Sequence, residues 1–209
     1  MKTLCDDCKP KPIMILCAGP AGGKDRLSQN ILNLIPSIGY IGCGDTLRRV
    51  ADSDSPYATQ IGELQAKGDK VPCNIVFEII REKIEGLRGP AILDGFPRTP
   101  EQARILASLP NEFFGIRINR DHGFRRVMLQ RRIDAAHSRG VAPRKDDNPF
   151  IFEKRSKGFE DEELPAFLEF VRMKNVSVFE TEHNVPDLDK LVGKIVEFHI
   201  KFFSQIRRC

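Results

Sequence analysis

The sequence predicts an α/β fold in which a five-stranded parallel sheet is covered by helices on both faces. Two observations support this prediction. Five short apolar runs alternate with longer segments of helical periodicity, which is the pattern of a parallel sheet with crossover helices. The first apolar run also leads into a glycine-rich turn, a lysine and a helical pattern. Ligands of such sheets bind at the carboxyl ends of the strands, so the residues after each strand are the candidates for a site.

The expected strands occupy the five apolar runs, at residues 13–17, 38–41, 90–93, 114–118 and 175–180. Helical periodicity fills the other segments, at residues 24–35, 45–52, 57–67, 73–86, 99–107, 121–137, 149–172 and 187–204. Two stretches interrupt the alternation. Residues 44–73 hold helical patterns without a strand, and we expect them to project from the core. Residues 133–147 are polar and rich in Arg, His, Gly and Pro, which predicts a mobile loop.

The composition is typical of one globular domain spanning residues 1–209, with an N-terminal tail at 1–11. Hydrophobic residues make up 41% and charged residues 30% of the chain. The net charge of +4 gives no reason to expect a nucleic-acid partner. No apolar run approaches the ~20 residues that span a bilayer, and the first residues lack the apolar region of a signal peptide. We therefore expect a cytoplasmic protein without membrane contact.

The six cysteines are scattered along the chain. Cys17, Cys43 and Cys73 lie in or beside expected helices and strands, and we expect them to be reduced. Cys5 and Cys8 form a Cys-x-x-Cys pair near the N-terminus. No second pair at metal-ligand spacing accompanies them, so a solvated tail is favoured over a metal or redox role.

The glycine-rich turn after the first strand is the first candidate site. It reads Ala-Gly-Pro-Ala-Gly-Gly-Lys at residues 18–24. Backbone N–H groups of such a loop, the N-terminus of the next helix and a lysine ammonium together bind phosphate oxygens. The match to the common pattern is incomplete, because Ala18 replaces the leading glycine and Asp25 replaces the hydroxyl residue after Lys24. Taken alone, the loop is also compatible with an ordinary strand-to-helix turn.

The second candidate site follows the expected strand at 90–93. Asp94 ends this apolar run, about seventy residues after Lys24. A carboxylate in this place can hold the water shell of a Mg²⁺ ion bound to nucleotide phosphates. Gly95 allows the backbone to turn, and Arg98 is expected to point from the strand end into the cleft.

Further basic residues lie beside turns. Residues 43–49 open a helix after the second strand, with Arg48 about one turn into it. Residues 68–72 end one helix at glycine and begin the next near proline. Arg144 starts the run Arg-Lys-Asp-Asp, and Arg155 follows eleven residues later.

Together these motifs resemble the adenylate kinase family of nucleoside monophosphate kinases. The resemblance covers roughly residues 12–200, with the motifs in the family's order. Its most specific piece is Gly-Phe-Pro-Arg-Thr at residues 95–99, followed by Gln102. The resemblance implies a three-layer P-loop fold with a small flap at 44–73, which binds the monophosphate, and a short lid at 132–144. A short lid without cysteine excludes the zinc-bearing type.

The resemblance also implies roles for single residues. ATP would bind to the phosphate loop, formed by Gly19, Pro20, Ala21, Gly22, Gly23, Lys24, Asp25 and Arg26. AMP would bind to Cys43, Arg48, Val71, Gly95, Arg98 and Gln102, with the two arginines on its phosphate and the glutamine on its base. The residues implied in catalysis are Lys24, Arg98, Arg131, Arg144 and Arg155. Asp94 would position Mg²⁺, the implied cofactor, through water, and the protein would act as a monomer.

The departures from the family pattern concern the donor loop. Ala18 and Ala21 replace residues that are glycine in the family. Asp25 places a carboxylate near the phosphates, and at ~6 Å with an effective dielectric near ~20 the repulsion is roughly 3 kcal/mol per unit charge. Arg26 replaces a threonine and offers donors that offset this repulsion.

The favoured function is reversible phosphoryl transfer from ATP with Mg²⁺ to AMP, giving two ADP. Two alternatives stay open: a nucleotide-binding pseudokinase that senses or scaffolds, and a kinase for UMP or CMP. Arg132 competes with Arg131 for the role beside the transferred group. The pair Arg125-Arg126 and Lys145 are expected to belong to a solvated face.

Overall fold

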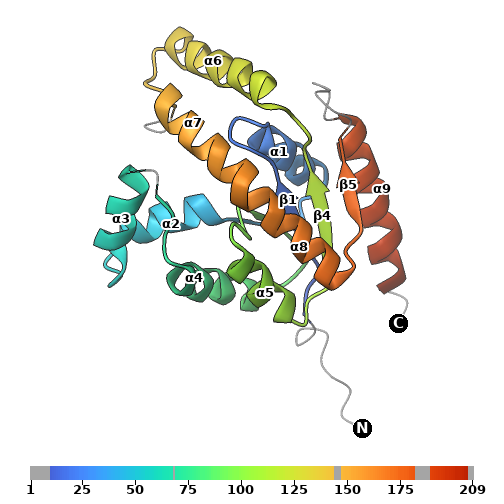
Figure 1. The fold of residues 1–209 in the computed structure, drawn as a ribbon. Helices are drawn as coiled ribbons and strands as arrows, with labels where there is room; N and C mark the ends of the chain where they lie inside the picture. The colour runs from blue at the N-terminus through green and yellow to red at the C-terminus, as the bar shows by residue number, and fades with distance from the viewer. Residues whose placement is uncertain (1–9, 68, 144–146, 182–188, 207–209) are drawn as a thin grey trace.

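The computed structural model describes residues 10–67, 69–143, 147–181 and 189–206, the last eight of these by their backbone alone. The strands in these residues form one sheet in the order β2-β3-β1-β4-β5, and every neighbouring pair is parallel (Figure 1). Their bounds are β1 Ile13–Cys17, β2 Gly39–Gly42, β3 Ala91–Asp94, β4 Phe113–Arg117 and β5 Val178–Glu180. The five expected strands and the parallel α/β class are confirmed, although β5 begins three residues later than expected.

Strand β1 is buried along its whole length and separates two hydrophobic cores. Its side chains alternate between them because successive residues of a strand point to opposite faces. Ile13 and Ile15 belong to the core that α4, α5 and α8 cover, whereas Met14 and Leu16 belong to the core that α1 and α9 cover. Helices therefore cover both faces of the sheet (Figure 1), which is the three-layer arrangement that the sequence predicts.

Helices α1 to α8 lie in the connections between strands, and α9 follows β5. Their bounds are α1 Lys24–Leu34, α2 Cys43–Ala51, α3 Ala58–Ala66, α4 Cys73–Glu85, α5 Pro100–Ser108, α6 His122–Ser138, α7 Pro149–Gly158, α8 Leu164–Lys174 and α9 Asp189–Ile206. Side chains fix several starts. Thr99, Asp121 and Asn148 each accept a hydrogen bond from a backbone N–H in the first turn of α5, α6 and α7, as N-cap residues do.

The single helix expected at 149–172 is wrong. A π-helical turn, Phe159–Glu163, separates α7 from α8, and it is called the π segment below. Pro165 gives a physical reason, since it has no N–H to donate and its ring crowds the carbonyl four residues earlier. The wide turn absorbs one residue, so Phe159 and Phe167 both remain buried on the sheet side.

The stretch 133–147, expected as a loop, is partly helical, because α6 continues to Ser138. Ala135 and Ala136 favour this continuation because they lose no side-chain entropy in a helix. The helix ends where Gly140 adopts a φ of +67°. The range expected for the lid, 132–144, therefore begins inside α6.

No helix in the described part of the chain is long and apolar enough to cross a membrane. Cys17, Cys43 and Cys73 are free thiols. Burial raises the pKa of Cys17 to about 12. Cys5 and Cys8 lie outside the described residues.

Candidate functional site

The turn after β1 adopts a tight phosphate-loop geometry despite its alanines. The Gly22 N–H donates to the Gly19 carbonyl at 3.0 Å, and a Cβ at residue 22 would lie 2.8 Å from that carbonyl oxygen. Gly23 caps α1 with a φ of 97°, and Ala21 has a φ of 56°. A left-handed alanine costs about 1–2 kcal/mol. Ala21 therefore adopts a strained backbone conformation at a position where the family motif has glycine.

Lys24 and Asp94 meet at the carboxyl ends of two neighbouring strands. Asp94 ends β3 and pairs in register with Leu16 of β1, and Lys24 begins α1. The Lys24 Nζ lies 3.1 Å from Asp94 Oδ1, with side chains 20% and 10% exposed. Tyr40 of β2 donates its hydroxyl hydrogen to Asp94 Oδ2 at 2.9 Å. Burial and Asp94 raise the pKa of Tyr40, so this hydroxyl stays a donor.

The Asp94 carboxylate fits an outer-sphere role toward a divalent cation. Its buried Oδ1 accepts no hydrogen bond and faces the Lys24 ammonium. No group of three or more His, Cys, Asp or Glu side chains that could hold a metal ion occurs in the described residues. One carboxylate is too few to hold Mg²⁺ directly, but it can orient water molecules of a cation that arrives with a triphosphate.

The backbone after Asp94 places Arg98 and Gln102 beside each other. Gly95 has a φ of +78°, and the Arg98 Nε donates to its carbonyl at 2.7 Å. The Arg98 N–H donates to the Gln102 Oε1 at 2.7 Å, so the buried amide of Gln102 is oriented by the same turn. The carboxylate of Glu163 lies 3.9 Å from the Arg98 guanidinium and raises its pKa.

The other residues expected at the acceptor site lie on or near α2 and α4. Arg48 is exposed and forms an ion pair with Asp45. Val71 and Cys43 are buried, and burial raises the pKa of the Cys43 thiol. The backbone role expected for Val71 is compatible with its burial. Arg48 lies at the solvent-exposed rim of the expected acceptor site.

Arg131, Arg144 and Arg155 are the arginines expected around the transferred phosphoryl group, and the two of them that the structure describes differ in exposure. Arg131 is exposed on α6, and its competitor Arg132 forms an ion pair with Asp147. Arg155 is half-buried on α7. Arg144 lies outside the described residues, as does Lys145. The described geometry therefore groups Lys24, Asp94, Gly95, Arg98 and Gln102, whereas the side chain of Arg131 is exposed on α6.

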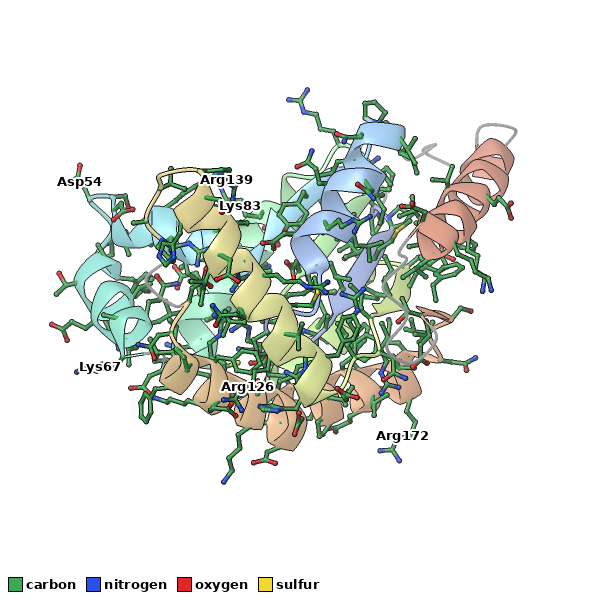
Figure 2. All side chains as sticks on the ribbon, turned by 90° about the horizontal axis from the view of Figure 1, so that it is seen from above. Asp54, Lys67, Lys83, Arg126, Arg139 and Arg172 are labelled. Carbon is green, nitrogen blue, oxygen red and sulfur yellow. The ribbon has the colours of Figure 1, made fainter. Side chains whose placement is uncertain are left out.

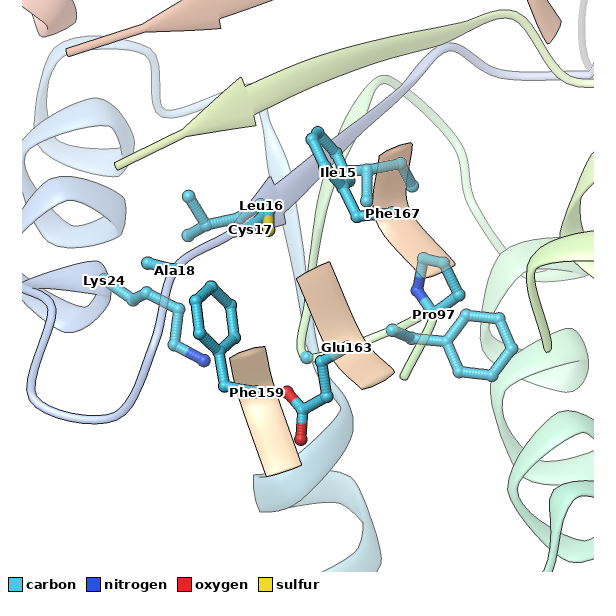
Figure 3. A pocket seen from close by; sticks show the side chains of 11 residues that line it. Ile15, Leu16, Cys17, Ala18, Lys24, Pro97, Phe159, Glu163 and Phe167 are labelled. Atoms are coloured by element: carbon cyan, nitrogen blue, oxygen red, sulfur yellow. The ribbon is translucent and has the colours of Figure 1, made fainter. Parts of the chain in front are cut away.

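A small cavity lies between the phosphate loop and the π segment. Figure 3 shows Lys24 on the α1 side of this cavity and Glu163 with Phe159 on the opposite side. The remaining lining residues are Ile15, Leu16, Cys17, Ala18, Gly95, Phe96, Pro97 and Phe167. The sequence analysis assigned no role to Glu163, which lies in a run of four acidic residues within the helical pattern at 149–172.

Carboxylates of the π segment contact basic groups from three parts of the chain. Glu160 pairs with Arg125 of α6. Glu162 lies 2.5 Å from the ammonium of Lys70 in the α3–α4 connection. Glu163 faces Arg98. Three of the four acidic residues of the π segment therefore form ion pairs within the protein, and one of these pairs includes the site residue Arg98.

Two arginines to which the sequence analysis gave no role in the site, Arg120 and Arg125, lie against the phosphate loop. Arg120 Nη1 donates to the Gly22 carbonyl at 2.9 Å. Arg125 is 1% exposed, so its expected place on a solvated face is wrong, whereas Arg126 is exposed as expected (Figure 2). A usable signal existed, since Arg125 shares the helical period of Leu129 and the other buried residues of α6.

No family model matches the chain. Curated relatives named adenylate kinase do match it. The one from Methylorubrum populi is 29% identical over 160 residues, covering 73% of this chain and 79% of the relative. The one from Methylobacterium radiotolerans is 26% identical over 190 residues, covering 88% and 93%. The one from Thermococcus kodakarensis is 37% identical over 112 residues, covering 53% and 46%.

Proposed function

This chain belongs to the adenylate kinase family, and on that premise we propose that it transfers a phosphoryl group reversibly from ATP with Mg²⁺ to AMP. The observation that carries the proposal is the ion pair between Lys24, at the start of α1, and Asp94, at the end of β3, next to Arg98. The pair offers an ammonium for donor phosphates and a carboxylate for the water shell of Mg²⁺. Arg98 offers a guanidinium for the acceptor phosphate.

In this mechanism the protein supplies position and charge. Phosphoryl transfer needs little covalent help, so cations that face the transferred group lower the barrier by stabilising its charge. The loop N–H groups and Lys24 would hold the β- and γ-phosphates of ATP. Arg98, with Arg48 at the rim, would hold the AMP phosphate in line with them. Mg²⁺ bound with ATP would neutralise charge between the phosphates, with its water ligands held by Asp94.

AMP is the proposed acceptor because of Gln102. Its Oε1 is occupied by the Arg98 N–H, which leaves its amide N–H₂ group to donate to a base. An adenine ring offers acceptor nitrogens to such a donor. UMP and CMP remain the alternative acceptors. The proposed enzyme would act as a monomer in the cytoplasm, and light scattering tests the first of these points.

The second candidate, a nucleotide-binding protein with little or no turnover, rests on the donor loop. Ala21 is held at a φ of 56°, Asp25 lies in the first turn of α1, and Glu163 adds a carboxylate to the cavity. The two carboxylates repel a triphosphate, and the left-handed alanine adds strain to the loop that would bind it. The Lys24–Asp94 and Arg98–Gln102 arrangements oppose this reading, because a site without turnover has no need of both.

A coupled assay separates these functions. The protein is mixed with ATP and Mg²⁺ and offered AMP, CMP, UMP or GMP, with Lys24→Met as the matched inactive control. We expect ADP formation with AMP and none in the control. A tenfold preference for CMP or UMP in kcat/KM would contradict the choice of AMP. Binding of ATP without transfer to any monophosphate would favour the second candidate.

A further inference from the structure

Arg125 lies in the first turn of α6 and turns inward, onto the phosphate loop. A Cβ built at residue 19 would lie 2.4 Å from the Arg125 Nη1 and 2.8 Å from its Cζ. Real Cβ atoms do not approach other atoms this closely, so the guanidinium occupies the space that any side chain at residue 19 would need. Gly19 and Arg125 therefore fit each other as a pair.

The partners of Arg125 come from the end of α7 and the π segment. Its Nη1 donates to Ser156 Oγ at 3.2 Å, and its Nη2 donates to the Glu160 carboxylate. Its Cζ lies 5.5 Å from the centre of the Phe159 ring, which itself lines the cavity beside Lys24. The side chain thus connects the π segment to the first half of the loop.

The fold alone gives no reason to place a cation here. Arg125 is 1% exposed, its Nε has no hydrogen-bond partner, and burial lowers its pKa. A buried ion pair is seldom more stable than apolar residues of the same size. The site lies next to the loop that would receive the most highly charged part of ATP, and a guanidinium paired with Glu160 there gives the loop a fixed neighbour.

We propose that Arg125 is a positioning residue of the donor site: it is anchored by Glu160 and fixes Gly19 and the loop in the shape that binds triphosphate. The inference rests on the proposed function for the identity of the ligand. The loop is held a second time at Gly22, by Arg120. Two buried arginines thus support a loop that contains alanine at a left-handed position.

The test is a double-mutant cycle of Gly19→Ala and Arg125→Met, read by the Kd of Mg–ATP in calorimetry. Each single variant is expected to weaken ATP binding by about tenfold, because either change removes the fit between residue 19 and the Arg125 side chain. Residues in contact also give effects that do not add. In the Arg125→Met background, Gly19→Ala is expected to change the Kd by less than about twofold, since the Nη1 and Cζ atoms that would lie closest to the new Cβ are absent. Arg126→Met, an exposed arginine of the same helix, is the matched control and is expected to leave the Kd unchanged.

Steady-state kinetics separates positioning from general stability. We expect Arg125→Met to raise the KM for ATP while the KM for AMP stays within about twofold, and Arg125→Lys to recover part of the loss because charge is kept. Additive effects in the cycle, or a lower melting temperature with unchanged ATP affinity, would overturn the inference. A wild type that binds ATP but transfers nothing would remove the proposed function and leave this inference standing. A wild type that binds no ATP would overturn both.

Discussion

Glu163→Gln is expected to improve the use of AMP. The Glu163 carboxylate lies 3.9 Å from the Arg98 guanidinium, and it shares a cavity with Lys24. A phosphate on the other side of Arg98 would lie at a distance of about 7 Å from this carboxylate, where the repulsion at an effective dielectric of ~20 is about 2.4 kcal/mol per unit charge. The amide keeps the size of the side chain and removes this repulsion.

The measurable effect is smaller than the full Coulomb energy. The two side chains are 28% and 22% exposed, so water and salt screen part of the interaction. We expect a net gain of about 1 kcal/mol, which corresponds to an approximately fivefold lower KM for AMP. The gain should shrink as salt is added, whereas a change in packing would not respond to salt.

The assay is the coupled assay with AMP varied at saturating ATP. Asp161→Asn is the matched control, since it removes an exposed carboxylate from the same π segment. It should leave the KM for AMP unchanged. A higher KM for AMP in Glu163→Gln would refute the reasoning, because it would mean that Glu163 holds Arg98 in place for the phosphate and does not compete with it.

Three further predictions test the site. Arg98→Lys should raise the KM for AMP by at least tenfold, because lysine loses the two-pronged donor arrangement; unchanged AMP kinetics would contradict its assignment. Asp25→Gly should tighten ATP binding and Arg26→Thr should weaken it, and the double variant should lie near the wild type; additive losses in calorimetry would exclude this charge balance. Cys17, whose pKa is raised to about 12, stays a thiol at pH 8, so iodoacetamide should label it only after unfolding. Labelling of the native protein, detected by mass spectrometry, would contradict its burial.

The sheet could be predicted because its strands carry their own signal. Residues 13–17 are five apolar residues in a row, and all five are buried, as expected for a central strand covered on both faces. The sites after β1 and β3 were predictable for the same reason, since strand ends are where parallel sheets place ligands. The sequence analysis found Lys24 and Asp94 as candidate site residues because each follows one of these two strands.

The features that were predicted wrongly depend in part on residues distant in the sequence. Arg125 shares the helical period of Leu129, but its burial also needs the space that Gly19 leaves and the charge that Glu160 supplies, and neither is visible from the local run of two arginines. The π segment depends on Pro165 together with the demand that Phe159 and Phe167 face one core. In both cases a local pattern predicted the commoner outcome, a solvated arginine or a continuous helix, and packing decided otherwise.

The altered phosphate loop has a different meaning once its surroundings are known. In the sequence, only Arg26 is available to offset the repulsion between Asp25 and a bound phosphate, and the two effects are expected to be nearly equal. In the structure, Arg120 and Arg125 also contact the loop backbone, and burial, with a smaller contribution from Arg26, lowers the pKa of Arg120. Holding the buried Arg120 guanidinium near Arg26 carries a cost in free energy, and an anion bound beside it would offset that cost. The substitutions in the loop therefore do not by themselves predict the loss of ATP binding, because the missing glycine and hydroxyl are accompanied by buried guanidinium groups.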